Sequence, residues 1–309
     1  MGVVFASIGD VAAKSGRSRR TNPRTGRMTP AQSELVKAHK RGDRAALARV
    51  ADRMGLVRLG EAIASTEPGV GEAALSAAPL ARGGVLLIGA ATDQIATSDW
   101  ARAASAAGAL GALLDGALPS AIEEWDVPAD VITRACTSLR ALAWRADAAL
   151  ATRLAALDAV AAAAPTCGRG ADLAPLARDN VPAVRRAAVM VAASGPDRDA
   201  LLRDAIADND RLVSTAGTAA ACRAEGRTRP GGQIEPPSEQ ALAAARVQAT
   251  APTTPPEDAV DMLDCLAASG SAQDKALLDE LQRRPPSPLR DRAVELGVRP
   301  SGAAAPGKP

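Results

Sequence analysis

Residues 173–193 read LAPLARDNVPAVRRAAVMVAA, and this stretch decides the fold class. A short apolar segment, Leu173 to Leu176, is followed by a polar turn at residues 179–180. Pro182 then stands where a second helix begins, and a proline there costs no hydrogen bond because first-turn N–H groups have no helical partner. The second helix has one apolar face at helical spacing, formed by Val184, Ala187, Ala188 and Val191. The stretch therefore predicts a helix, a tight turn and a second helix.

The same pattern recurs elsewhere in the chain. Leu59, Pro68 and Val70 match Leu173, Pro182 and Val184 at a constant offset of 114 residues (173 − 59 and 182 − 68). Weaker copies occur at a pitch near 30 residues, in the segments 100–104, 132–136, 206–217 and 277–294. A regular pitch of this length is typical of stacked supersecondary units, each of which buries its apolar face only against a neighbour.

This helix–turn–helix pattern resembles HEAT repeats, particularly the short bacterial kind, over about residues 55–225 and more loosely to 297. The family's Asp in the turn and Arg on the second helix match Asp179 and Arg185, whereas Gly71 and Ser214 replace that arginine in other copies. The resemblance implies an all-α solenoid of stacked helix pairs, with armadillo-like architecture, whose second helices line a concave face.

Five segments are expected along the chain. Residues 1–27 form a disordered basic arm and 28–225 the HEAT-like array; 226–238 form a loop, 239–298 further helices that continue the array, and 299–309 a disordered tail. The arm holds six basic residues and one acid, a net charge of +5, which leaves −3 for the rest of a chain of net charge +2. Attraction to nucleic acid is therefore expected from the arm rather than from the body.

Composition favours helices and excludes several kinds of site. Aromatic residues make up only 1% of the chain, and hydrophobic residues, mainly alanine and leucine, make up 47%. A hydrolytic triad would need the single histidine, His39, which we interpret as a solvated residue of a basic amphipathic helix, and the absence of any CxxC pair argues against zinc. We expect no cofactor, no metal and no membrane span. The cysteines are interpreted as reduced thiols, with Cys136 and Cys222 in the core, and the protein as cytoplasmic.

One motif supports an enzyme as a minor alternative. Gly69, Gly71 and Ala74 fit a G-x-G-x-x-A dinucleotide fingerprint, with 85–88 as a strand and Asp93 as the acid that binds ribose. The segment before it is helical rather than a buried strand, so we interpret both glycines as helix-start residues of a repeat.

A partner-binding stripe is predicted on the second helices. Aligning Trp100, Ile132 and Val184 places Arg102, Arg134 and Arg186 at one repeat position, and Met190 shares a helix face with Arg186. These four residues are the predicted contacts for a protein partner, whose acidic groups the arginines would bind; Trp100 and Trp144 are interpreted as packing residues.

The sequence thus favours a non-enzymatic protein–protein interaction scaffold. The first alternative is a nucleic-acid-associated HEAT-like protein that uses the basic arm. The second is a nucleotide-binding enzyme that uses Gly69 and Gly71. No catalytic residue is assigned.

Overall fold

The structure is a computed structural model that describes residues 28–115, 124–168, 170–193, 197–223, 227–228 and 234–298. These residues form helices and no strand; a lone antiparallel bridge joins Thr228 to Ile234. The all-α prediction is confirmed for this part of the chain. The arm 1–27 and the tail 299–309 lie outside the described residues, so the expectations made for them stay predictions.

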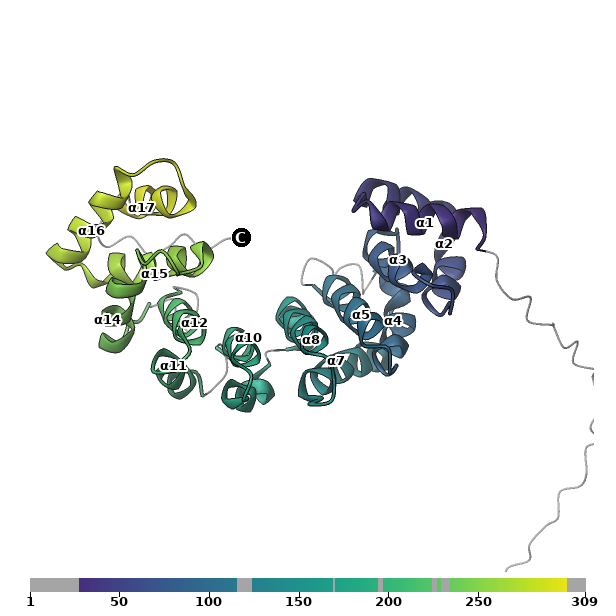
Figure 1. The fold of residues 1–309 in the computed structure, drawn as a ribbon, viewed down its shortest axis with the longest axis horizontal. Coiled ribbons are helices and arrows are strands. Elements are labelled where there is room, and N and C mark those ends of the chain that lie inside the picture. Colours follow the sequence, from purple (N-terminus) through teal and green to yellow (C-terminus); the bar gives the residue numbers. More distant parts are fainter. Residues whose placement is uncertain are drawn as a thin grey trace, which may run out of the picture.

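The helices form a curved double row (Figure 1). The described part of the chain begins with α1 (Pro30–Lys40) and then alternates between an outer and an inner row. Consecutive members of the inner row pack against one another along the concave side of the curve; they are α3 (Val70–Ala77), α5 (Trp100–Leu113), α8 (Leu150–Ala162), α10 (Pro182–Ala192), α12 (Arg211–Cys222), α15 (Pro256–Ser269) and α17 (Pro288–Val298).

Each inner helix pairs with the outer element that precedes it in the chain. The outer row consists of α2 (Arg44–Ile63), α4 (Ile88–Ile95), α7 (Ala129–Trp144), the 3₁₀ helix η3 (Ala171–Arg178), α11 (Arg198–Ile206), α14 (Glu239–Gln248) and α16 (Ala272–Gln282). Short elements complete the connections: η1 (Ala78–Leu80), η2 (Gly84–Leu87) and α9 (Ala164–Cys167).

Local sequence explains where the inner helices start. The Asp99 carboxylate accepts hydrogen bonds from the N–H groups of residues 101 and 102, and Asp210 caps α12 in the same way. Such caps satisfy donors that have no partner within the helix. Pro182 occupies the first position of α10, as the turn at 179–182 predicts.

Helix α10 contributes side chains to two clusters of buried apolar residues. Val184, Ala188 and Val191 belong to the core of the first half of the chain, while Val189 of the same helix belongs to the core of the second half. Helices α14 and α15 both pack on α12, so the segment 239–298 is joined to the array by direct helix contacts. The two clusters of buried apolar residues therefore meet at α10.

The dinucleotide fingerprint does not lie in a strand–turn–helix unit. Gly69, with φ of +76°, precedes the first residue of α3, and Gly71 lies inside that helix. The segment before them is the end of α2, and residues 84–87 form η2 instead of the strand that the alternative requires. A dinucleotide site needs a buried strand before the glycines. The structural context thus removes the basis of the nucleotide-binding alternative.

The reduced-thiol expectation is wrong, because the four cysteines form two disulfides. Cys136 of α7 is bonded to Cys167 at the end of α9, and Cys222 of α12 is bonded to Cys265 of α15. The first pair is 31 residues apart in the sequence and the second pair 43, so the sequence spacing gave no sign of the pairing. The cytoplasmic prediction, which those thiols supported, loses that basis.

Both disulfides are open to a direct test. Unfolding the protein in guanidinium without reductant should expose no thiol to Ellman's reagent, and four should appear after reduction. Because each bond closes a loop of more than 30 residues, its loss should lower the free energy of unfolding by about 3–4 kcal/mol. Four reactive thiols before reduction would contradict the pairing.

Candidate partner-binding surface

A groove of about 550 Å³ lies on the inner row, between α8, α10 and the start of α12. Leu154, Ala187, Met190 and Leu212 supply apolar surface to it, and Leu212 is 49% exposed. Charged groups are few, and they come from Asp158, Arg186 and Asp210. This combination of apolar lining and a few polar groups is typical of sites that receive a ligand or a partner segment.

The periodicity of α10 explains why two predicted residues reach this groove. Its positions 184, 188, 189 and 191 are buried in the core, whereas positions 186, 187 and 190 are only half-buried and line the groove. Arg186 and Met190 are four residues apart, and both line the groove as half-buried side chains. Of the four predicted contacts, these are the two that the structure brings together.

Arg186 is nevertheless held by the protein itself. Its Nη2 donates to Oδ2 of Asp258 on α15 at 3.1 Å, and Oε1 of Glu257 lies 3.8 Å away. Asp258 is almost fully buried, and this burial raises the pKa of its carboxyl despite the nearby guanidinium. Arg186 therefore joins α10 to α15, and its charge is compensated before any partner arrives.

Arg102 also has an internal role. Its Nη2 donates to the carbonyl oxygens of Ile63 and Ser65, both at 2.6 Å, where α2 ends. The guanidinium lies over Gly71, and a Cβ at that glycine would stand 2.3 Å from Nη2. The glycine in α3 thus leaves room for the arginine of the next inner helix, and an alanine there would displace the guanidinium from its present position.

Arg134 lies in the other row, so the prediction of a single stripe is wrong. It belongs to α7, which is the outer helix of its pair, and its Nη1 contacts Oδ1 of Asp93 on α4 at 3.0 Å. Both side chains are more than half exposed. The alignment failed because a step of 32 residues from Trp100 leads to an outer helix, whereas the next inner helix, α8, begins only at Leu150.

The two tryptophans differ in exposure. Trp100 is half-buried, with the Arg145 guanidinium 4.6 Å from its ring centroid, as expected of a packing residue that carries a cation–π contact. Trp144 is 45% exposed at the end of α7, so its interpretation as a packing residue fits less well.

Two Arg–Asp ion pairs, here called the ladder, join the central inner helices, and the sequence analysis identified only part of them. Arg153 of α8 contacts Asp179 at 2.6 Å, and Arg185 of α10 makes two bonds to Asp208, at 2.8 and 3.0 Å. Both aspartates lie in the turn before the next inner helix. The sequence pattern had identified Asp179 and Arg185 but not Arg153. Arg153 nevertheless stands three residues after the first residue of its helix, which is also the position of Arg185.

The carboxyl groups of the ladder are held in their charged form. The hydrogen bond from Arg185 is the main reason why the pKa of Asp208 is lowered. Burial alone would raise the pKa of Asp179, but the bonds from Arg153 and from the Val181 N–H lower it overall. The ladder therefore operates as ion pairs at neutral pH.

Within the described residues no helix combines the length and the apolar character needed to cross a bilayer. In the same part of the chain, no three His, Cys, Asp or Glu side chains gather as metal ligands would.

Comparisons with known proteins do not assign a family. No protein-family model matches the chain, and no curated protein matches it. Among solved structures, a crystal structure of an engineered protein from the Northeast Structural Genomics Consortium is 17% identical. The match covers 87% of this chain and 95% of that one with a TM-score of 0.32.

The ladder predicts a pH-dependent effect of Asp208→Asn. At pH 7 the free energy of unfolding of the variant should be lower by about 2 kcal/mol, because the two charge-assisted hydrogen bonds from Arg185 are replaced by weaker hydrogen bonds to a neutral amide. Since the folded-state pKa of Asp208 is lowered, the native pair stabilises at neutral pH and its contribution disappears as the pH falls through that pKa.

Urea titrations of both proteins between pH 7 and pH 2 would measure this difference. The two stabilities should converge toward the acid end. A gap that stays constant over the whole range would mean that the charge of Asp208 does not stabilise the fold.

Proposed function

We propose that the chain is a non-enzymatic protein-interaction scaffold, a HEAT-like α-solenoid that receives a segment of a partner protein in its concave groove. The groove between α8, α10 and α12 is the observation that carries this proposal. Its position on the inner row agrees with the way in which stacked helix pairs usually bind other proteins.

Three features support the solenoid description. Each helix pair packs on the pairs next to it in sequence, the 114-residue internal match places equivalent turns before α3 and α10, and the Arg–Asp ladder joins successive inner helices. In a linear array each unit contacts only its neighbours, so a long curved surface is left free.

The groove is best matched to an amphipathic helix or an apolar segment with few charges. Leu154, Met190 and Leu212 provide apolar contacts, and Asp158 stands exposed beside them. Grooves of this kind bind the apolar face of a partner helix through side chains spaced three and four residues apart. The predicted arginine stripe favoured an acidic partner. The groove fits such a partner less well, because Arg186 is already paired with Asp258.

We infer that the scaffold works in an oxidising compartment. Disulfides persist outside the reducing cytosol, and here they tie α7 to α9 and α12 to α15. This inference replaces the cytoplasmic prediction, and free thiols in the titration described above would remove its basis.

The double variant Ala183→Glu/Leu212→Glu tests the groove without disturbing the core. Both residues are exposed and stand in the first turns of α10 and α12, where a negative charge is favoured by the helix dipole. The variant should keep its circular dichroism spectrum and melting temperature but place two charges in the apolar groove. Partner recovery in affinity capture with quantitative mass spectrometry should then fall at least tenfold.

The matched control is Val247→Glu, at a site on α14 that is 74% exposed and lies in the outer row. It should recover the same partners as the wild type. Equal recovery by the groove variant would show that partners bind elsewhere, and the proposed function would then lose its site.

A further inference from the structure

Basic side chains gather on the outer face of α1 and at the turn that follows it. Helix α1 stands at the end of the double row (Figure 1), where its buried apolar side chains pack on α2 and α3. Lys40 and Arg41 come three and four residues after Lys37, so these three exposed side chains share one face of the helix. Arg44, the first residue of α2, is exposed beside them in sequence. These four residues are called the basic patch.

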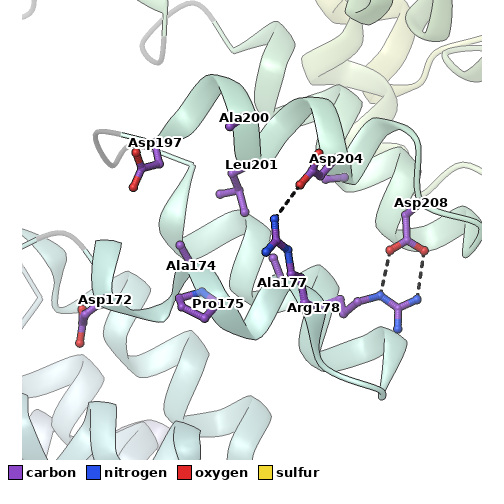
Figure 2. Close-up of a pocket in the computed structure, with 12 residues that line it drawn as sticks. Asp172, Ala174, Pro175, Ala177, Arg178, Asp197, Ala200, Leu201, Asp204 and Asp208 are labelled. Atoms are coloured by element: carbon purple, nitrogen blue, oxygen red, sulfur yellow. Dashed lines mark hydrogen bonds and ion pairs between the residues drawn. The ribbon is translucent and has the colours of Figure 1, made fainter.

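The basic patch has no carboxylate partner among the described residues. Other arginines of the chain are engaged, and Figure 2 shows Arg178 in contact with Asp204 and the double bond between Arg185 and Asp208. By contrast, no side chain of the patch forms an ion pair or donates a hydrogen bond within the described part of the chain. The acid nearest in sequence, Asp43, caps the start of α2. Four positive charges thus stand beside one negative charge and are available to an anion outside the molecule.

The shape of the patch suits a broad anionic surface better than a single bound phosphate. The last turn of α1 presents carbonyl groups, which repel an anion, and the carboxylate of Asp43 occupies the start of α2, where free N–H groups would otherwise bind one. Proteins that bind nucleic acid usually fix its phosphates with such N–H groups and reach the bases in a groove. A helix face at the end of the array is convex and can lie against a flat surface.

We propose that the basic patch docks this end of the solenoid on a membrane surface rich in anionic phospholipids. Each Lys or Arg beside such a surface raises the binding constant roughly fivefold, and the attraction acts over about 10 Å at moderate salt. The apolar face of α1 is buried in the body, so docking is electrostatic and needs no insertion into the bilayer. The proposal goes beyond the scaffold function, because docking through α1 leaves the concave groove between α8, α10 and α12 open to a partner.

Cosedimentation of the full-length protein with vesicles tests the docking. At low salt the wild type should bind vesicles of phosphatidylcholine that contain about one-third phosphatidylglycerol, and NaCl at about 0.5 M should release it because salt screens the charges. Vesicles of pure phosphatidylcholine should not bind it. Binding to the anionic vesicles should weaken at least tenfold in the variant Lys37→Gln/Lys40→Gln/Arg41→Gln/Arg44→Gln. Its melting temperature should stay close to that of the wild type, because no side-chain contact is lost and glutamine is a good helix former.

The matched control removes four other exposed basic side chains that have no partner in the described chain, as Arg82→Gln/Arg203→Gln/Lys275→Gln/Arg283→Gln. It has the same net charge as the patch variant and the same arm 1–27, and it should bind within about twofold of the wild type. Equal loss of binding in both variants would overturn the proposal, since net charge alone would then decide binding. So would a wild type that ignores anionic vesicles, or a patch variant that binds them as the wild type does.

A labelled DNA duplex of mixed sequence separates a membrane surface from nucleic acid. At equal phosphate concentration and equal salt, the wild type should bind the duplex at least fivefold more weakly than the anionic vesicles. Tighter binding to the duplex that the patch variant loses would assign the patch to nucleic acid and overturn docking on a membrane. None of these outcomes bears on the concave groove, which is tested by partner capture.

Discussion

Close approach of helix backbones is the constraint on which the rest of this structure depends. Gly111 of α5 faces Ala159 of α8, and a Cβ on the glycine would stand 2.8 Å from the alanine Cα. Gly217 of α12 meets Ala205 of α11 just as closely. Because backbones approach this far only through glycine and alanine, the core uses many small side chains and few aromatic ones. Stability then depends on packing density, since each small side chain buries little apolar area.

Polar contacts add direction to this packing. Arg102 binds the end of α2, Arg153 and Arg185 bind the turns ahead of the following inner helices, and Arg186 reaches α15. Each arginine links a helix to a different pair, so together they set the order and spacing of the units. The same contacts explain why arginines that look like a binding stripe in the sequence serve mainly as internal supports. The apolar side chains of the groove, rather than these arginines, therefore provide the surface that is available to a partner.

The sequence predicts local structure better than it predicts how units meet. The turn at 179–182, the start of α10 at Pro182 and most of its buried face follow from helical spacing and from the geometry of proline. Ala187 was predicted to be buried with Val184, but it is half-buried and lines the groove. Arg186 and Met190 reach the groove for the same reason. The row in which Arg134 lies was mispredicted, because the connection between α5 and α7 breaks the regular pitch. The disulfides and the salt bridge from Arg186 to Asp258 join residues far apart in sequence, and no local pattern encodes such contacts.

A comparison of two alanine substitutions in α5 tests the close approach most directly. Gly111 and Gly108 lie in the same helix, but a Cβ at Gly108 would have no neighbour within 4 Å. Urea unfolding should therefore show that Gly108→Ala stabilises the protein by about 0.5–1 kcal/mol, the usual gain in helix propensity. Gly111→Ala should instead destabilise it by about 1–3 kcal/mol, because α5 and α8 must move apart. Equal stabilisation by both substitutions would contradict the account, since it would mean that the helices do not meet through their backbones.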